Sequence, residues 1–92
     1  MMSITAEQRE QVRLSILRHL DAAAGTPYGI SQALLLQFVR NEGWRQLDGN
    51  AIAAELQYLE DKGLIVNASK YLSPENKHWR ITAEGRDFFA QQ

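Results

Sequence analysis

Apolar side chains recur every three or four positions over much of this chain, and this spacing predicts amphipathic helices. We expect helices over residues 6–24, 32–42, 49–62 and 83–90. In the first of these, Val12, Ile16 and Leu20 share one face, and in the third Ile52, Leu56 and Leu59 do so. A core built between these faces is therefore the expected organisation of the chain.

Residues that favour helix ends bracket the predicted helices. The expected N-caps are Thr5, Ser31, Asp48 and Thr82. Gln8, three residues after Thr5, completes a capping box. The expected stops are Gly25, Gly43 and Gly63. Gly63 can adopt the left-handed conformation that lets a chain leave a helix and continue as a strand.

The pattern changes after Gly63. Residues 64–66 and 79–81 are short β-prone runs, and residues 73–76 form a turn cluster between them. A further extended stretch is expected at residues 28–30. The predicted order is helix, short strand, helix, helix, strand, loop, strand and helix. This order predicts an α+β fold that is mainly helical.

Two segments resemble a known family. Residues 56–65, LQYLEDKGLI, resemble the junction between the recognition helix and the wing of winged helix-turn-helix proteins. Residues 79–86, WRITAEGR, resemble the exit from the wing. The chain looks like bacterial and phage regulators of the MarR or PadR kind. The resemblance implies one domain over residues 1–92, with a three-helix core, a β-hairpin wing at 64–81 and a C-terminal helix.

The same resemblance implies a DNA-binding transcription regulator whose third helix, residues 49–62, enters the major groove of double-stranded DNA. The residues it places against bases are Asn50, Ala51, Ala54, Gln57 and Tyr58. Those expected at the phosphates before this helix are Arg40, Arg45 and Gln46. Those expected on the wing are Lys70, Lys77, His78 and Arg80. Asn and Gln can pair with adenine, and Ala can pack on a thymine methyl group.

The charge distribution complicates this interpretation. The net charge is −1, whereas nucleic-acid binders are usually basic. Residues 48–63 hold four carboxylates and one lysine, and residues 64–81 hold three cations and one carboxylate. Glu55 counts most against DNA, because it lies in the middle of the expected recognition helix, and Glu60 and Asp61 count less. The alternative is a protein-interaction module that does not bind DNA directly.

Some apolar residues lie off the main helix faces. They are Leu14, Leu36, Phe88 and Phe89, which we expect to form a dimer or partner surface. Phe88 and Phe89 are adjacent, so they cannot point the same way. A homodimer paired through the first and last helices is the working hypothesis, against the alternative that these residues are simply buried.

The composition excludes several classes of site and function. The chain has no cysteine and only His19 and His78 as histidines, so disulfides, metal sites and other cofactors are not expected. The longest apolar run, residues 33–36, is too short to cross a bilayer. No nucleophile motif or phosphate-binding glycine loop occurs, so an enzyme is not expected. A cytoplasmic location is the expectation.

Overall fold

Four helices and three short strands make up the part of the chain that the computed structural model describes, residues 5–69 and 77–92. In order they are α1 (Ala6–Ala22), β1 (Ile30–Ser31), α2 (Gln32–Asn41), α3 (Gly49–Asp61), β2 (Ile65–Asn67), β3 (His78–Ile81) and α4 (Ala83–Ala90). The predicted α+β class, mainly helical, is therefore confirmed.

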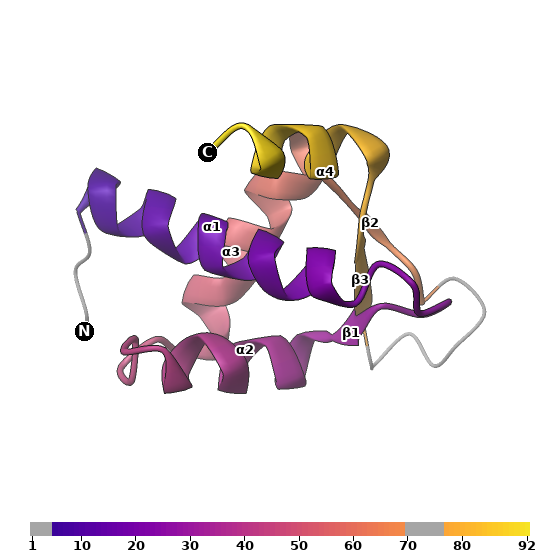
Figure 1. The fold of residues 1–92 in the computed structure, drawn as a ribbon. Helices are drawn as coiled ribbons and strands as arrows, with labels where there is room; N and C mark the ends of the chain where they lie inside the picture. The colour runs from indigo at the N-terminus through magenta and orange to yellow at the C-terminus, as the bar shows by residue number, and fades with distance from the viewer. Residues whose placement is uncertain (1–4, 70–76) are drawn as a thin grey trace.

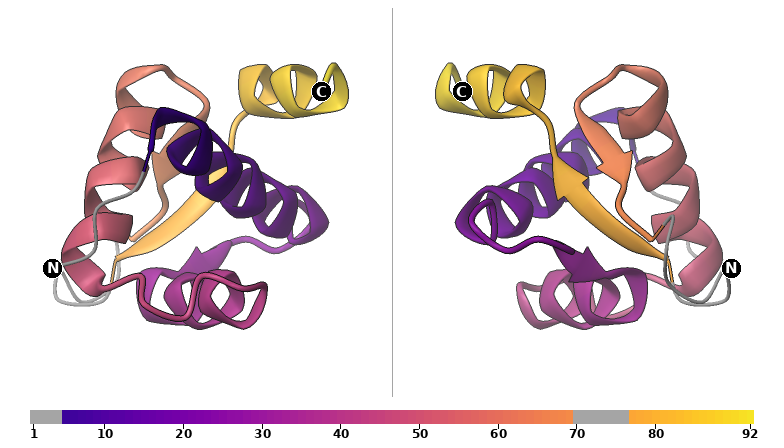
Figure 2. Two further views of the ribbon diagram at one scale, coloured as in Figure 1. Left: turned by 90° about the vertical axis from the view of Figure 1, so that its left-hand side faces the viewer. Right: turned by 90° about the vertical axis from the view of Figure 1, so that its right-hand side faces the viewer.

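Helix α1 is the centre of the arrangement. It packs against α2, α3, α4 and β3. In Figure 1, α2 lies below α1, α4 lies above it, and α3 crosses behind it. The right-hand view of Figure 2 shows the three strands in front of α1, so the sheet covers one end of the helical layer.

The sheet is antiparallel, with β3 between β1 and β2. Trp79 pairs with Ile30 of β1, and Ile81 pairs with Ile65 of β2. All four side chains are buried, so Trp79 and Ile81 lie on the same side of the strand, as predicted. The extended stretch expected at residues 28–30 contributes only Ile30 to a strand, yet β1 makes the sheet three-stranded.

A single apolar cluster joins the helices to the sheet. Its fully buried members include Val12, Ile16, Leu17, Leu20, Leu35, Val39, Leu47, Ile52, Leu56 and Leu59. The indole nitrogen of Trp79 donates a hydrogen bond to Gln32 Oε1 at 3.0 Å, which satisfies the polar end of this buried side chain. Burial of each large aliphatic side chain stabilises the fold by about 1.5–3 kcal/mol.

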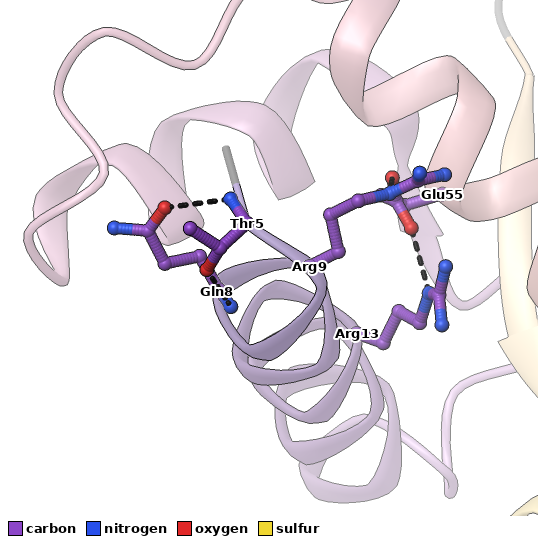
Figure 3. Close-up of polar contacts among 5 residues, drawn as sticks. All are labelled: Thr5, Gln8, Arg9, Arg13 and Glu55. Carbon is purple, nitrogen blue, oxygen red and sulfur yellow. Dashed lines mark hydrogen bonds and ion pairs between the residues drawn. The ribbon is translucent and has the colours of Figure 1, made fainter. Parts of the chain in front are cut away.

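The predicted N-caps are confirmed at all four helices. The side chains of Thr5, Ser31, Asp48 and Thr82 each accept a hydrogen bond from the backbone N–H three residues later. The backbone N–H of Thr5 in turn donates to Gln8 Oε1 at 2.9 Å, which completes the capping box (Figure 3). Because these bonds are local, the four starts could be identified from sequence.

The C-terminal end of α1 differs from the prediction. The helix ends at Ala22 and not at Ala24, and the expected stop, Gly25, is not among the glycines with positive φ. Thr26 instead closes the turn, since both its backbone N–H and its hydroxyl donate to the carbonyl of Ala23, at 3.0 and 2.7 Å. The bond from the Thr26 hydroxyl to this carbonyl favours a turn over a further turn of helix, so the helix ends before Gly25.

Gly63 forms the predicted left-handed turn between α3 and β2, with φ of 78°. Leu64 N–H donates to the carbonyl of Leu59, and Gly63 N–H donates to that of Glu60, a Schellman arrangement that ends α3. The hydroxyl of Thr82 donates to the Gly63 carbonyl at 2.7 Å. The turn is thus attached to the start of α4.

Gly85 is required by the same junction. A Cβ atom at this position would lie 2.0 Å from the carbonyl oxygen of Leu64. Only a residue without a side chain lets α4 approach the start of β2 this closely.

Candidate functional site

Helix α3 has one face toward solvent that carries amide and methyl groups over its first turns and Asp61 at its C-terminal end. Asn50, Ala54 and Gln57 are exposed and follow helical spacing, and we call these three residues the outward strip. The opposite face holds the buried side chains of Ile52, Leu56 and Leu59. Three of the predicted base-reading residues therefore share one exposed face, while Ala51 is half-buried beside it.

The connection between α2 and α3 brings two arginines together at the N-terminal end of α3. Arg40 Nε donates to the backbone carbonyl of Arg45 at 3.1 Å, and both side chains are exposed. Gln46 is exposed beside them. The Asp48 carboxylate already caps this end, where Oδ1 accepts from the backbone N–H of Ala51 at 2.8 Å. The groups near α3 that could contact phosphate are therefore the two arginine side chains, with Gln46 as a neutral donor.

The predicted wing residues lie elsewhere. Lys77 and Arg80 are exposed on β3 or just before it, and His78 is half-buried. In Figure 1 the sheet and the α2–α3 connection lie at opposite ends of the molecule. The described residues therefore do not bring these cations next to Arg40 and Arg45. Lys70 falls outside the described residues.

Glu55 corrects the sequence interpretation. We expected its charge on the DNA side of the helix, but its side chain is only 3% exposed and is turned toward α1. Glu55 Oε1 accepts from Arg13 Nε at 2.7 Å, and Oε2 accepts from Arg9 Nε at 3.0 Å (Figure 3). Two guanidinium groups therefore offset this carboxylate, and it lies away from the outward strip.

Arg9 and Arg13 are the functional residues that sequence reasoning missed. One signal was present, because the two arginines are four residues apart on one face of a predicted helix. A second signal was the position of Glu55, directly before Leu56 on the apolar side of the third helix. A carboxylate in that position needs a partner when it is buried.

Tyr58 was expected either to face bases or to cover the flank of the third helix. It is 39% exposed, and the Arg13 guanidinium carbon lies 3.7 Å from the centroid of its ring, in a cation–π contact. The Lys62 ammonium is 5.7 Å from the same centroid. Tyr58 therefore covers the flank of α3 that faces α1, because Arg13, one of the two arginines that bind Glu55, also contacts its ring.

The expected partner surface is divided by the fold. Leu36 and Phe89 are half-buried and pack against the apolar core, so they do not form an open surface. Leu14 and Phe88 line a pocket between α1, α3 and α4, and Phe88 is 41% exposed. Phe89 also lines a separate hollow on α4, beside Asp21 and Arg86.

A second polar cluster ties α1 to the end of α2. Glu42 Oε1 accepts from the Ser15 hydroxyl and lies 2.7 Å from His19 Nε2, while Oε2 forms an ion pair with Arg18. The His19 ring stacks on Phe38, with centroids 4.9 Å apart. Burial lowers the pKa of His19 below its usual 6.5, and the Arg18 charge lowers that pKa further.

Among residues 5–69 and 77–92 no group of three or more metal-ligating side chains gathers at one place. Within the same ranges, each helix is too short or too polar to traverse a lipid bilayer.

Comparison with protein-family models, with curated proteins and with solved structures finds no match to this chain.

Proposed function

We propose that this chain is a winged helix-turn-helix protein that binds double-stranded DNA and regulates transcription. In this proposal α3 is the recognition helix, and the β2–β3 hairpin is the wing. The element order supports it, because α1, β1, α2 and α3 precede β2, which follows α3 through the Gly63 turn and pairs with β3. The segments at 56–65 and 79–86 that resemble the family both lie at this junction.

The observation that carries the proposal is the direction of Glu55. The carboxylate that would have repelled phosphates is buried against Arg9 and Arg13, on the far side of α3 from the outward strip. The outward strip offers two amide side chains and one methyl group. These are the groups that read adenine and thymine in the major groove.

The positive charges that a duplex requires lie beside this strip. Arg40 and Arg45 are exposed at the start of α3 and supply phosphate contacts there. Asp61 and Glu60 lie at the other end of the helix, where Gln57 Nε2 donates to Asp61 at 2.9 Å. In this proposal the N-terminal half of α3, with Asn50 and Ala54, lies nearest the bases, and Gln57 reads a base only by exchanging its bond to Asp61 for one to DNA.

Phosphate contact is tested by measuring binding of a random duplex by fluorescence anisotropy over a range of salt. Arg45→Ala should weaken binding to every sequence and lower the dependence of log K on log salt by about one. Arg86→Ala, which removes an exposed arginine from α4, is the matched control and should change neither quantity. Equal effects of the two variants would contradict the assignment of Arg45.

Base reading is tested on sequences selected from a random pool. Asn50→Ala should relax the preference at a single base pair, with a loss of about 1–3 kcal/mol on the selected site. Its binding to random duplex should change little, because Asn50 is not expected to contact phosphates. Asn41→Ala, at the exposed end of α2, is the control and should leave the selected sequence unchanged.

The second candidate is a protein-interaction module, favoured by the half-exposed Phe88 and by the net charge of −1. The two functions separate in one measurement. If random duplex at low salt gives no binding at high protein concentration, the DNA proposal is overturned and the interaction module takes its place.

A further inference from the structure

The side-chain amide of Gln57 is already engaged within its own helix. Its Nε2 atom donates a hydrogen bond to Asp61 Oδ1 at 2.9 Å and a longer one to Glu60 Oε1 at 3.4 Å. A primary amide carries two N–H groups. Both N–H groups of Gln57 therefore have a carboxylate acceptor within α3.

The other members of the outward strip are not held in this way. Asn50 is exposed in the first turn of α3, and its side chain has no hydrogen-bond partner among residues 5–69 and 77–92. Ala54 presents only a methyl group. The strip therefore divides into an N-terminal part that is open to DNA and a C-terminal residue whose donors are already used.

The bond from Gln57 to Asp61 depends only on α3 itself, because residues four apart lie on the same side of a helix. Asp61 is exposed, and no basic side chain among the described residues forms an ion pair with it. In water the pair adds little to the stability of the helix, since either group can be hydrated instead. Gln57 can therefore exchange Asp61 for water at little cost while the chain is free.

The balance changes when the helix enters a groove and water is displaced. To read adenine, a glutamine uses both ends of its amide, since Oε1 accepts from N6 and Nε2 donates to N7. The donated N–H group must first leave its carboxylate. This exchange replaces a hydrogen bond to a charged acceptor with one to a neutral acceptor, and the charged one is the stronger. It also leaves the Asp61 carboxylate without its donor beside a chain of phosphates.

We propose that Asp61 is a specificity-determining residue, which keeps the Gln57 amide from contacting the bases. The base pair opposite Gln57 is then read weakly, and discrimination depends on Asn50 and Ala54. Glu60 acts in the same direction but less, because its contact with Nε2 is longer. The inference rests on the proposed function, since it concerns how α3 reads DNA.

Selection of sites from a random duplex pool, followed by anisotropy titrations of single-base variants of the selected site, tests the role of Asp61. The original chain should discriminate by less than about twofold at the base pair opposite Gln57. Asp61→Ala should gain a preference for adenine there of about tenfold, as a complete bidentate contact provides. The same preference should disappear in the double variant with Gln57→Ala, which identifies the base pair that Gln57 contacts.

Asp61→Asn separates the hydrogen bond from the charge. Its side-chain oxygen can still accept from Gln57, whereas the negative charge is gone. Both variants should bind random duplex more tightly and to a similar extent, because each removes the same repulsion from phosphates. The new adenine preference should be clearly smaller in Asp61→Asn than in Asp61→Ala. Asp87→Ala, which removes an exposed carboxylate from α4, is the control and should leave the selected sequence unchanged.

Two results would overturn the proposal. The first is a loss of about tenfold on the selected site from Gln57→Ala alone, because Gln57 would then already read its base in the original chain. The second is a set of base preferences in Asp61→Ala that matches that of Asp61→Asn, because the hydrogen bond would then play no part. Both results require a bound duplex, so they leave the proposed function in place. Failure of the original chain to bind any duplex would instead remove the proposed function, and this inference with it.

Discussion

The two ends of α1 are joined to neighbouring helices by the same kind of contact, a glutamate that faces basic side chains. At the N-terminal end, Arg9 and Arg13 bind Glu55 of α3. At the C-terminal end, Arg18 and His19 meet Glu42 at the end of α2. The two sites differ in burial, because the Glu55 side chain is 3% exposed and that of Glu42 is 29% exposed.

This difference decides how much each contact contributes. A buried carboxylate has lost its hydration, so its arginines are its only means of compensation, and removal of either partner leaves a costly charge. A partly exposed carboxylate keeps water molecules that can replace a lost partner, so the same change costs little. Glu55 therefore contributes strongly to the packing of α3 against α1, while Glu42 contributes only weakly to the attachment of the end of α2.

The largest effect should follow from Glu55→Ala. It leaves Arg13, which is 18% exposed, without its carboxylate, and we expect the free energy of unfolding to fall by about 3 kcal/mol. Urea unfolding measures this loss. Asp61→Asn, on the exposed end of the same helix, is the control and should stay within about 0.5 kcal/mol of the original protein. A loss no greater than that of the control would show that the Glu55 contact is not a stabilising one.

Thr5→Ala should come next. It removes the capping box that fixes the first turn of α1, immediately before Arg9, and should cost about 1 kcal/mol in urea unfolding. Because Arg9 binds Glu55 from this turn, the losses from Thr5→Ala and Glu55→Ala should not add in the double variant. Simple additivity would mean that the cap and the Glu55 contact are independent. Ser31→Ala, the equivalent change at α2, should add to Glu55→Ala without coupling.

Glu42→Ala should have a smaller effect, a loss of about 0.5–1 kcal/mol, since Arg18 is 53% exposed and can be hydrated again. The measurement is the same urea titration, repeated at high salt. Salt should reduce this loss much more than it reduces the loss from Glu55→Ala, because exposed charges are screened and buried ones are not. If salt reduced both losses equally, the difference in burial between Glu42 and Glu55 would not determine how much each contact contributes.

The smallest effect should come from pH at the Glu42 site. The pKa of His19 is lower in the folded chain than its ordinary 6.5, because of burial and of Arg18, so the unfolded chain binds the proton more tightly. The stabilising contribution is then complete above pH 6.5 and decreases as pH falls from there toward the folded pKa. The free energy of unfolding should therefore decrease slightly on acidification through this window.

The control for this measurement is His19→Gln, which can still donate to Glu42 but does not titrate. Its stability should be flatter over the same pH interval. If acidification instead stabilises the original protein, protonated His19 must be held by the Glu42 carboxylate strongly enough to overcome burial and Arg18.

Much of the candidate site could be predicted from sequence, and the errors are instructive. The outward strip is exposed because the apolar period of α3 determines which side of that helix faces solvent. Arg40 at the end of α2, and Arg45 and Gln46 in the connection that follows, are exposed as well. Tyr58 lies on the border of that face, where the period does not decide, and the contact with Arg13 turned it toward α1. Leu36 and Phe89 are half-buried because they pack against the apolar core, a contact that the helical period of their own segments does not specify.

The sequence by itself determined where each helix begins and how α3 passes into β2, because these features depend on hydrogen bonds between residues three to five positions apart. Tertiary structure alone decided the direction of Glu55, since its partner Arg9 is 46 residues away along the chain. It also decided that β1 joins β3 as a third strand. Such contacts form only when α1, α3 and the sheet pack together, and no local pattern specifies which charges then meet.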